Sequence, residues 1–511
     1  MSYQHYERLY DFSGGLNNRD ANALLQSNET PDMCNVILGK KGTLETRPGT
    51  SYFRDAPVEN EESVTSIFEY VRSGDAYILA FAGGKLKRAS QLGWDEVTCE
   101  DEDLTLTPDS YLEFAVNPVI DKAAFVNGED GYFETDGEEF AEVEPYEPDE
   151  DELTEVGDCV IPESPKLICY HKFRTWLANI KDYPDRVYYS VDDINGNTTY
   201  NYFTATGFIK ITNPKGEGIT AMVSFKERLY LFTKTTIRVI AGDDIDEFAA
   251  VELSKTVGAI SQRSVSVFGD YIIFLGEGGV YIFDGISAPM KISVRIPATM
   301  EKVATSYKHL SCGAIHQGRY YLSVPESTVN DVTLVYDTEV IPLTYIGEKH
   351  SFANSPWVLH RGYTPTQWLV SQDANLYFAS DDGYVYQYGV GDTDAGRMIE
   401  VVYTTKLLDL DMPDRAKRIR RLILDASQER DSYLKIDYKV DSEESKWQEF
   451  RRQVDLSKPI DRMFFYFPDG RGPLCRKIAF RFSTVYAGSR FRINGFTLDM
   501  AIRGHQEERS G

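Results

Sequence analysis

Short runs of β-branched and aromatic residues, joined in pairs by polar or glycine turns, recur along the first 390 residues. In one clear copy, residues 271–275 (YIIFL) precede a Glu-Gly-Gly turn at 277–279, and residues 280–285 (VYIFDG) follow it. Glycine supplies the positive φ that a tight hairpin turn needs, and the flanking residues suit a pleated, half-buried surface. The pattern therefore predicts a β-hairpin.

The same hairpin recurs six more times at a nearly constant interval. Matching positions are 48, 51, 54, 42, 49 and 56 residues apart, and they are Tyr77, Phe125, Trp176, Tyr230, Ile272, Tyr321 and Tyr377. A period in this range fits one four-stranded propeller blade. We therefore expect an all-β chain with a partly degenerate β-propeller of about six to eight blades at residues 51–390. The alternative is a set of unrelated hairpins in sandwiches.

Residues 391–511 carry a different pattern. Longer runs of alternating polarity occupy 399–410, 418–426, 434–440, 477–485 and 491–500. Such alternation indicates strands with one buried and one solvated face. This part predicts an appended C-terminal β-sandwich domain, with a frayed tail after Arg503.

Residues 1–50 contain no hairpin of this kind and are expected to form a lead-in or interface segment. Gly14 and Gly15 permit a sharp bend, and Arg47 must be extended because Pro48 follows it. Thr30 before a proline at position 31 has the chemistry of a helix start, so a short helix is predicted across residues 31–36.

Charge is distributed unevenly along the chain. The formal net charge is −26, which argues against a protein that grips nucleic acid or an anionic membrane. Residues 413–511 contain 21 Lys and Arg against 15 Asp and Glu, a net of +6, so residues 1–412 carry −32. Domains of opposite sign suit head-to-tail contact between copies of the chain, or docking on an acidic neighbour.

One stretch is almost purely acidic. Residues 129–158 contain 15 acidic side chains and no Lys or Arg, and prolines interrupt any hydrophobic period. Residues 146–155 are therefore expected to form an exposed loop. It is either a solvated surface insertion or a region that repels a passing polyanion or a neighbouring subunit.

Cysteine spacing and hydropathy bear on compartment. The six cysteines are scattered without a C-x-x-C pair, which predicts reduced thiols of a protein made in a cytoplasm. The N-terminal residues lack the features of a signal peptide, and no run of about 18 apolar residues predicts a membrane span.

The sequence lacks the usual signatures of catalysis. Phosphate-loop, dinucleotide-binding, zinc-protease and nucleophile-elbow motifs are missing, and the seven histidines have no metal-ligand spacing. Residues 190–192 (SVD) resemble the start of a sialidase Asp-box, but Gly196 falls two positions too late. We therefore expect no catalytic residue, metal site or cofactor, and a protein that is not an enzyme.

An ordered series of short motifs resembles one known family. Residues 12–17 (FSGGLN), Asn35 and residues 42–49 (GTLETRPG) are similar to the N-terminus of tail hub, or tail nozzle, proteins of short-tailed phages. The hairpin at 270–285, residues 186–190 (RVYYS) and the basic strand at 417–422 (KRIRRL) are also similar. The match covers most of the chain.

This resemblance implies a virion structural protein of the phage tail, synthesised in the bacterial cytoplasm. It implies a ring, in this family a hexamer, that lies below the portal and adaptor, contacts other tail proteins or fibres, and conducts DNA through its lumen without sequence-specific contact. The candidate assembly-interface residues are Gly14, Gly15, Asn35, Arg47, Pro48, Gly49, Arg418, Arg420 and Arg421. Two alternatives are a propeller-based tail enzyme that processes glycans, and a module that binds a host receptor.

Overall fold

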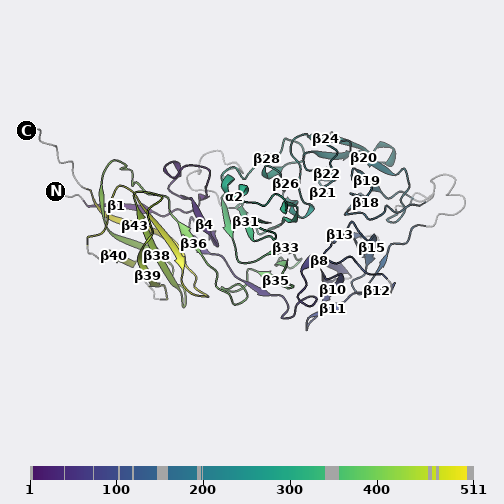
Figure 1. Cartoon of the computed structure of the whole chain (residues 1–511). Coiled ribbons are helices and arrows are strands. Elements are labelled where there is room, and N and C mark those ends of the chain that lie inside the picture. Colours follow the sequence, from purple (N-terminus) through teal and green to yellow (C-terminus); the bar gives the residue numbers. More distant parts are fainter. Residues whose placement is uncertain are drawn as a thin grey trace, which may run out of the picture.

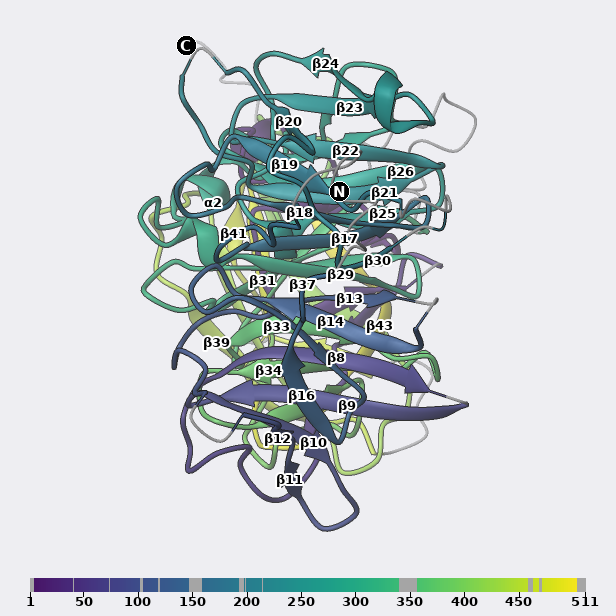
Figure 2. The ribbon, with the colours of Figure 1, turned by 90° about the vertical axis from the view of Figure 1, so that its right-hand side faces the viewer.

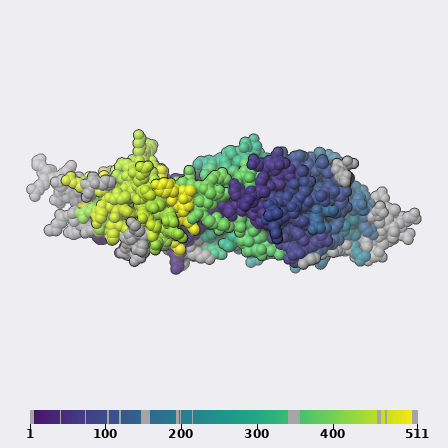
Figure 3. All heavy atoms as spheres, turned by 90° about the horizontal axis from the view of Figure 1, so that it is seen from below, coloured from purple at the N-terminus to yellow at the C-terminus, as the bar shows by residue number. Residues whose placement is uncertain are grey.

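The computed structural model describes residues 4–39, 41–72, 74–101, 104–117, 120–146, 159–192, 197, 199–213, 215–339, 356–457, 463–467 and 471–502. The chain is nearly all β, as predicted, and it is elongated, with a propeller at one end and a sandwich at the other (Figures 1 and 3). Residues 147–158 of the acidic stretch, which include nearly all of the predicted loop at 146–155, and the C-terminal tail lie outside the described residues.

Seven four-stranded units form the propeller, so the predicted fold is confirmed and the blade count is seven. The seven sequence anchors all lie in the second strand of a unit. Blade 1 contains β8 (Val64–Arg72), β9 (Asp75–Ala82), β10 (Lys85–Ala89) and β11 (Trp94–Glu96). Blade 2 contains β13 (Glu113–Asn117), β14 (Lys122–Val126), β15 (Tyr132–Thr135) and β16 (Glu139–Glu142), with β12 (Thr98–Cys99) added at the edge. Blade 3 contains β17 (Leu167–His171), β18 (Arg174–Ala178), β19 (Arg186–Tyr189) and β20 (Phe208–Lys210).

The remaining blades continue in chain order, and the last one takes its outer strand from the start of the propeller. Blade 4 contains β21 (Ala221–Phe225), β22 (Arg228–Phe232), β23 (Ile237–Ala241) and β24 (Ala249–Ser254), and blade 5 contains β25 (Ser266–Phe268), β26 (Tyr271–Gly276), β27 (Gly279–Phe283) and β28 (Met290–Lys291). Blade 6 contains β29 (Cys312–His316), β30 (Arg319–Val324), β31 (Val332–Asp337) and β32 (Trp357–His360). Blade 7 contains β33 (Pro365–Val370), β34 (Leu376–Ser380), β35 (Val385–Tyr388) and β7 (Thr50–Tyr52).

Two links close the ring. In blade 7, β7 pairs antiparallel with β35. The first strands of blades 7 and 1 are joined by the Thr366 hydroxyl, which donates to Val64 O at 2.5 Å, and by the Ile67 amide, which donates to the Gln367 side chain at 2.9 Å. Figure 2 views the disc from its edge, where the blade strands run side by side. Closure leaves no exposed inner sheet edge.

The sandwich contains two sheets, and the N-terminal segment completes both. One sheet contains β40 (Met463–Tyr466), β37 (Lys417–Ala426), β43 (Arg492–Ile502), β6 (Leu44–Thr46) and β5 (Val36–Leu38), with β1 (Gln4–Leu9) on β43 and β41 (Leu474–Cys475) on β37. The other contains β39 (Gln448–Asp455), β38 (Tyr433–Val440), β42 (Ile478–Thr484), β36 (Val402–Thr404) and β4 (Asp32–Cys34). The sequence did not predict these N-terminal contributions.

The prediction of a short helix across residues 31–36 is wrong. These residues fall in β4 and β5, after the short strand β3 (Glu29–Thr30), which pairs with β2 (Gly15–Leu16). The Thr30 hydroxyl bonds Thr404 O and Asp32 O instead of capping a helix. Pairing of β4 with β36 satisfies the backbone and outweighs the local helix-start chemistry.

Helical structure in the described residues is confined to short turns. These are α2 (Pro297–Glu301) between blades 5 and 6, and 3-10 turns at Asn22–Leu24, Ile245–Glu247, Gln262–Ser264 and Lys308–Leu310. No helix among these elements has the length and apolar character needed to cross a membrane. The six cysteines are free thiols.

Candidate functional site

The N-terminal candidate residues meet at the junction between propeller and sandwich. Strands β4 and β5 pack against β32, the outer strand of blade 6, while β2 also contacts β32. One hydrophobic core runs without a break from blades 5 to 7 through this junction into the sandwich, and includes Phe12, Trp357 and Phe496. The two domains are therefore joined as parts of one packed body.

Arg47 is the polar centre of the junction, and its side chain is fully buried. Its guanidinium forms a bidentate pair with Asp394 at 2.9 and 2.5 Å, and its Nε donates to Asn35 Oδ1 at 2.8 Å. The two remaining N–H groups donate to Pro48 O and Arg361 O. All five guanidinium donors are thus used, which is the condition for burying an arginine at acceptable cost.

Asn35 connects the same group to both domains. Its amide nitrogen donates to Glu400 O at 2.8 Å on the sandwich side, and its Oδ1 also accepts from the Arg361 amide at 2.8 Å. The backbone φ of +58° is a left-handed conformation that asparagine tolerates better than most residues. The amide side chain therefore determines how the chain turns between β4 and β5.

Close backbone approach explains two of the glycines. Gly15 has a φ of +72°, and a Cβ there would lie 2.7 Å from Pro356 Cβ, at the start of β32. A Cβ on Gly49 would lie 2.1 Å from Thr393 O. Gly14 and Pro48 belong to the same junction. The interface role predicted for these residues concerns contacts between copies; inside a single chain they hold its two domains together.

The C-terminal candidates lie on β37, on the sheet that includes β1. Register places Tyr6, Asp499, Arg421 and Tyr466 in one row across four strands, and Arg8, Thr497, Ile423 and Phe464 in the next row. Both rows face away from the second sheet. Arg418 is half-buried and donates to Gly472 O, and Arg420 lies at a register shift between Ile419 and Arg421. Of the three arginines, Arg421 is the one at the centre of this face.

We give the name outer sandwich face to the aromatic and arginine residues of these rows, together with Tyr10, which directly follows β1: Tyr6, Arg8, Tyr10, Arg421, Phe464 and Tyr466. A hollow of about 560 Å³ is lined by four of them, Tyr6, Arg8, Tyr10 and Phe464, together with Ile423 and Thr497. Tyr6, Phe464 and Tyr466 are 46%, 52% and 54% exposed, which is high for aromatic side chains. Arg421 pairs with Asp499 at 2.7 Å and lies over the rings of Phe464 and Tyr466. Aromatic residues and arginine are the types enriched in protein–protein contacts.

Sequence reasoning missed a third region, at the centre of the propeller. The Arg263 side chain precedes blade 5, stacks on Tyr111 before blade 2 at 3.8 Å, and donates to Thr366 O in blade 7 at 2.8 Å. Blades 2, 5 and 7 are not neighbours in the ring, so this side chain must lie across the axis. Burial raises the pKa of nearby Glu113 to about 7, against the opposing effect of Arg263 and Lys166.

In the part of the chain that the structure describes, no group of three or more His, Cys, Asp or Glu side chains is placed to hold a metal ion. Asp192, from the residues that resemble an Asp-box start, pairs with Arg174 at 2.6 Å. This ion pair gives Asp192 a structural partner within blade 3.

No family model matches the chain, and no curated protein does. Among solved structures, the extracellular domain of a putative hybrid two-component system from B. thetaiotaomicron is 10% identical, with a TM-score of 0.43, over 84% of this chain and 58% of that one. PorZ, a surface component of the type-IX secretion system of Porphyromonas gingivalis, is 10% identical, with a TM-score of 0.36, over 69% and 43%. The WD40 domain of Neurospora crassa Pan2 is 10% identical, with a TM-score of 0.36, over 67% and 95%.

The chain spans about half the length of the first bacterial structures that it matches, with shares of 43%, 49% and 59%. At this level of identity the likeness concerns the propeller fold, and it carries no information on activity or partners.

Proposed function

We propose that this chain is a structural subunit of a phage tail hub or nozzle ring, in which copies associate head to tail and the genome leaves through the ring. The observation that carries the proposal is the outer sandwich face: exposed aromatic and arginine side chains on the sandwich, at the opposite end of the molecule from a strongly acidic propeller. The resemblance of the N-terminal motifs to the tail hub family supports the same function.

A ring subunit must transmit force between its two contact surfaces without bending. The continuous core and the buried Arg47–Asp394 pair support this requirement, because they make the propeller and the sandwich one body. The residues that resemble the tail hub family, at 12–17, Asn35 and 47–49, lie at this junction. In this proposal the family motif preserves the relative placement of the domains.

The contact between copies is heterologous in this proposal. Different surfaces meet, and the ring closes when the rotation between copies closes. The outer sandwich face of one copy packs its aromatic side chains on the next copy. The propeller, residues 51–390, carries −28, while the sandwich, residues 1–50 and 391–511, carries +2, so charge favours a sandwich–propeller contact over propeller against propeller.

The genome channel lies between copies and not inside one propeller. Arg263 crosses the axis of the single propeller through its contacts with Tyr111 and Thr366. Around a central lumen, acidic surfaces of the propellers would let DNA slide, because cationic contacts would bind its phosphates. An adaptor above the ring and other tail proteins below it are the partners that this arrangement requires.

Native mass spectrometry of the purified chain, alone and with its tail adaptor, tests the proposal. We expect a ring of about six copies, formed alone or on the adaptor. The double variant Phe464→Ser/Tyr466→Ser should abolish the ring, because it removes the two most exposed aromatics of the outer sandwich face.

The matched control is Phe173→Ser, which removes a 68% exposed aromatic ring from a propeller turn. This variant should still assemble into the ring of copies. A wild-type chain that stays monomeric with the adaptor, and that hydrolyses a host-surface glycan or binds cells as a free protein, would refute the proposal in favour of an enzyme or a receptor-binding module.

A further inference from the structure

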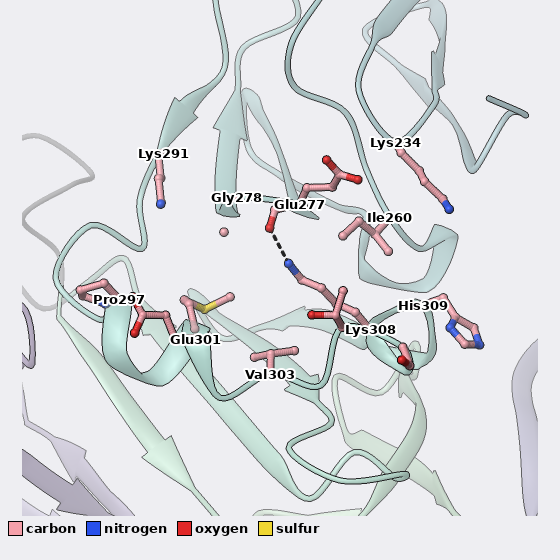
Figure 4. Close-up of a pocket in the computed structure, with 14 residues that line it drawn as sticks. Lys234, Ile260, Glu277, Gly278, Lys291, Pro297, Glu301, Val303, Lys308 and His309 are labelled. Carbon is pink, nitrogen blue, oxygen red and sulfur yellow. Dashed lines mark hydrogen bonds between the residues drawn. The ribbon is translucent and has the colours of Figure 1, made fainter. Parts of the chain in front are cut away.

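A cavity of about 570 Å³ opens on one face of the propeller between blades 4, 5 and 6. Its wall comes from the turn between β22 and β23, the turn between β26 and β27, and the connection from β28 through α2 to blade 6 (Figure 4). The volume lies within the roughly 300–1,000 Å³ range of small-ligand sites. None of the residues used in the proposed function lines it.

Three lysines converge on this cavity from different elements. Lys234 lies in the β22–β23 turn, Lys291 in β28 and Lys308 in a 3-10 turn, and Figure 4 shows their ammonium groups on different sides of the space. Among the described residues, none of the three has a carboxylate within ion-pair distance. In a chain with 80 acidic and 54 basic side chains, three lysines without a carboxylate partner in one cavity are not explained by ion pairing among the described residues.

Several lysines elsewhere on the propeller pair with carboxylates. Lys87 pairs with Glu59 at 2.7 Å, and Lys226 pairs with Asp270 at 3.1 Å. The pairing of these side chains is the expected outcome on an acidic surface. The cavity lysines lack such a partner, and they are distinguished by their convergence on one space.

Lys308 is the most constrained of the three. Its half-buried ammonium donates to Gly276 O at 3.1 Å and to Glu277 O at 2.7 Å. An ammonium has three N–H donors, so one remains for a ligand. Burial lowers the pKa of Lys308, Glu277 opposes that effect, and Lys291 adds to it. An anion bound beside Lys308 would stabilise its charged form against both the burial and the repulsion from Lys291.

Positive charge extends from the cavity toward the propeller axis. His309 also lines the cavity. Burial is the main cause that lowers the pKa of His309, and the charges of Lys166, Arg263 and Lys234 lower it further. Two exposed carboxylates, Glu277 and Glu301, lie on the wall as well. The site thus offers three lysines around a space that also has acidic edges, so the phosphate groups of a ligand would lie beside the lysines and away from the two carboxylates.

We infer that this cavity binds a small multivalent oxyanion of the polyphosphate type, held by the ammonium groups of Lys234, Lys291 and Lys308. A ligand with two or more charged groups can contact lysines on opposite walls, whereas a single phosphate fills little of the space. The same phosphate chemistry is present in free polyphosphate and in a nucleic-acid backbone. The inference does not depend on the ring function.

Calorimetric titration of the full chain with tripolyphosphate tests it. We expect saturable binding, and a loss of affinity of about tenfold or more in Lys234→Gln/Lys291→Gln, since each lost charge contact weakens binding by about threefold or more. The control Lys215→Gln/Lys255→Gln removes the same charge from exposed lysines outside the cavity and should bind as the wild type does.

A second arm identifies the source of the phosphate. A single-stranded oligonucleotide of about eight nucleotides is added in competition with tripolyphosphate. Displacement that depends on Lys234 and Lys291 supports the site and assigns it to nucleic acid; no displacement supports the site and assigns it to free polyphosphate. The inference is overturned if tripolyphosphate fails to bind at millimolar concentration, or if the cavity variant and the control variant lose affinity equally.

Discussion

The domain junction and the outer sandwich face each centre on an arginine, and the two arginines differ in what surrounds them. Arg47 is fully buried, and all five of its donors have partners within the chain. Arg421 pairs with Asp499 but lies among aromatic side chains that are about half exposed. The first environment holds one chain together. The second leaves apolar area available for another molecule.

The same residue type can therefore stabilise a single chain in one environment and favour association between molecules in another. An arginine that is satisfied inside the chain contributes to stability and little to association. An arginine on an exposed aromatic face contributes little to stability and can contribute to association. We therefore expect changes at the junction to alter the free energy of unfolding, and screening of the exposed charges to alter assembly.

The largest expected effect comes from Arg47→Met. This change leaves Asp394, whose side chain is 5% exposed, without its counter-charge, so the free energy of unfolding should fall by about 3–5 kcal/mol. Urea unfolding followed by tryptophan fluorescence measures it. The double variant Arg47→Met/Asp394→Asn should recover part of the loss, because no unpaired charge remains buried.

The control for Arg47 is Arg430→Met. Arg430 pairs with Asp431, but the two side chains are 96% and 88% exposed, and such pairs contribute little. If Arg47→Met were no more destabilising than Arg430→Met, the junction would not depend on the buried pair, and its arginine would be free for a role between copies.

The second prediction concerns acid. His360 is buried at the junction, where its Nε2 lies 3.0 Å from Val36 O. Burial, and then the positive charges of Arg47 and Arg319, lower the pKa of His360 from 6.5 to about 3, although the hydrogen bond to Val36 opposes them. The unfolded chain takes up a proton near pH 6.5 and the folded chain does not. Stability present above pH 6.5 is therefore lost as the pH falls toward 3, by about 2 kcal/mol at pH 5.

His360→Gln isolates this effect, since glutamine can still donate to Val36 O but does not titrate. Urea unfolding at about pH 7.5 and about pH 5 should give a smaller difference for this variant than for the wild type. Some slope of the same sign should remain, because burial and Lys172 lower the pKa of His171 to about 4. Parallel wild-type and variant curves would show that His360 does not couple protons to folding.

Much of the fold could be predicted from the sequence because local patterns of apolar and turn residues determine the blade hairpins. The seven anchors, from Tyr77 to Tyr377, all fall in second strands, since a blade repeats one hairpin signal about every 50 residues. Non-local pairing could not be predicted. The three-residue strand β4 has no periodicity of its own, and its partner β36 is more than 360 residues away.

The candidate residues were identifiable as a motif, but their environment was not. Glycines and an Arg-Pro-Gly turn indicate a tight, specific conformation without showing whether its surroundings are another domain or another subunit. Asp394, the partner of Arg47, lies in residues 389–396 (GVGDTDAG), whose glycine-rich composition indicates only a linker. Arg263 and the three cavity lysines had no signal at all. Packing of neighbouring blades brings the lysines together, and the arrangement of the blades around the axis brings Arg263 to its partners.

The smallest expected effect on stability comes from salt, and it separates the two regions most directly. Ions screen exposed charges over about 10 Å at 0.1 M and reach a buried pair poorly. The stability difference between the wild type and Arg47→Met should therefore change by less than about 0.5 kcal/mol between about 0.05 M and about 0.5 M NaCl. The ring, which depends on oppositely charged exposed surfaces, should dissociate over the same range in sedimentation velocity. A ring that persists in high salt would mean that apolar contacts of Phe464 and Tyr466 carry the association without help from charge.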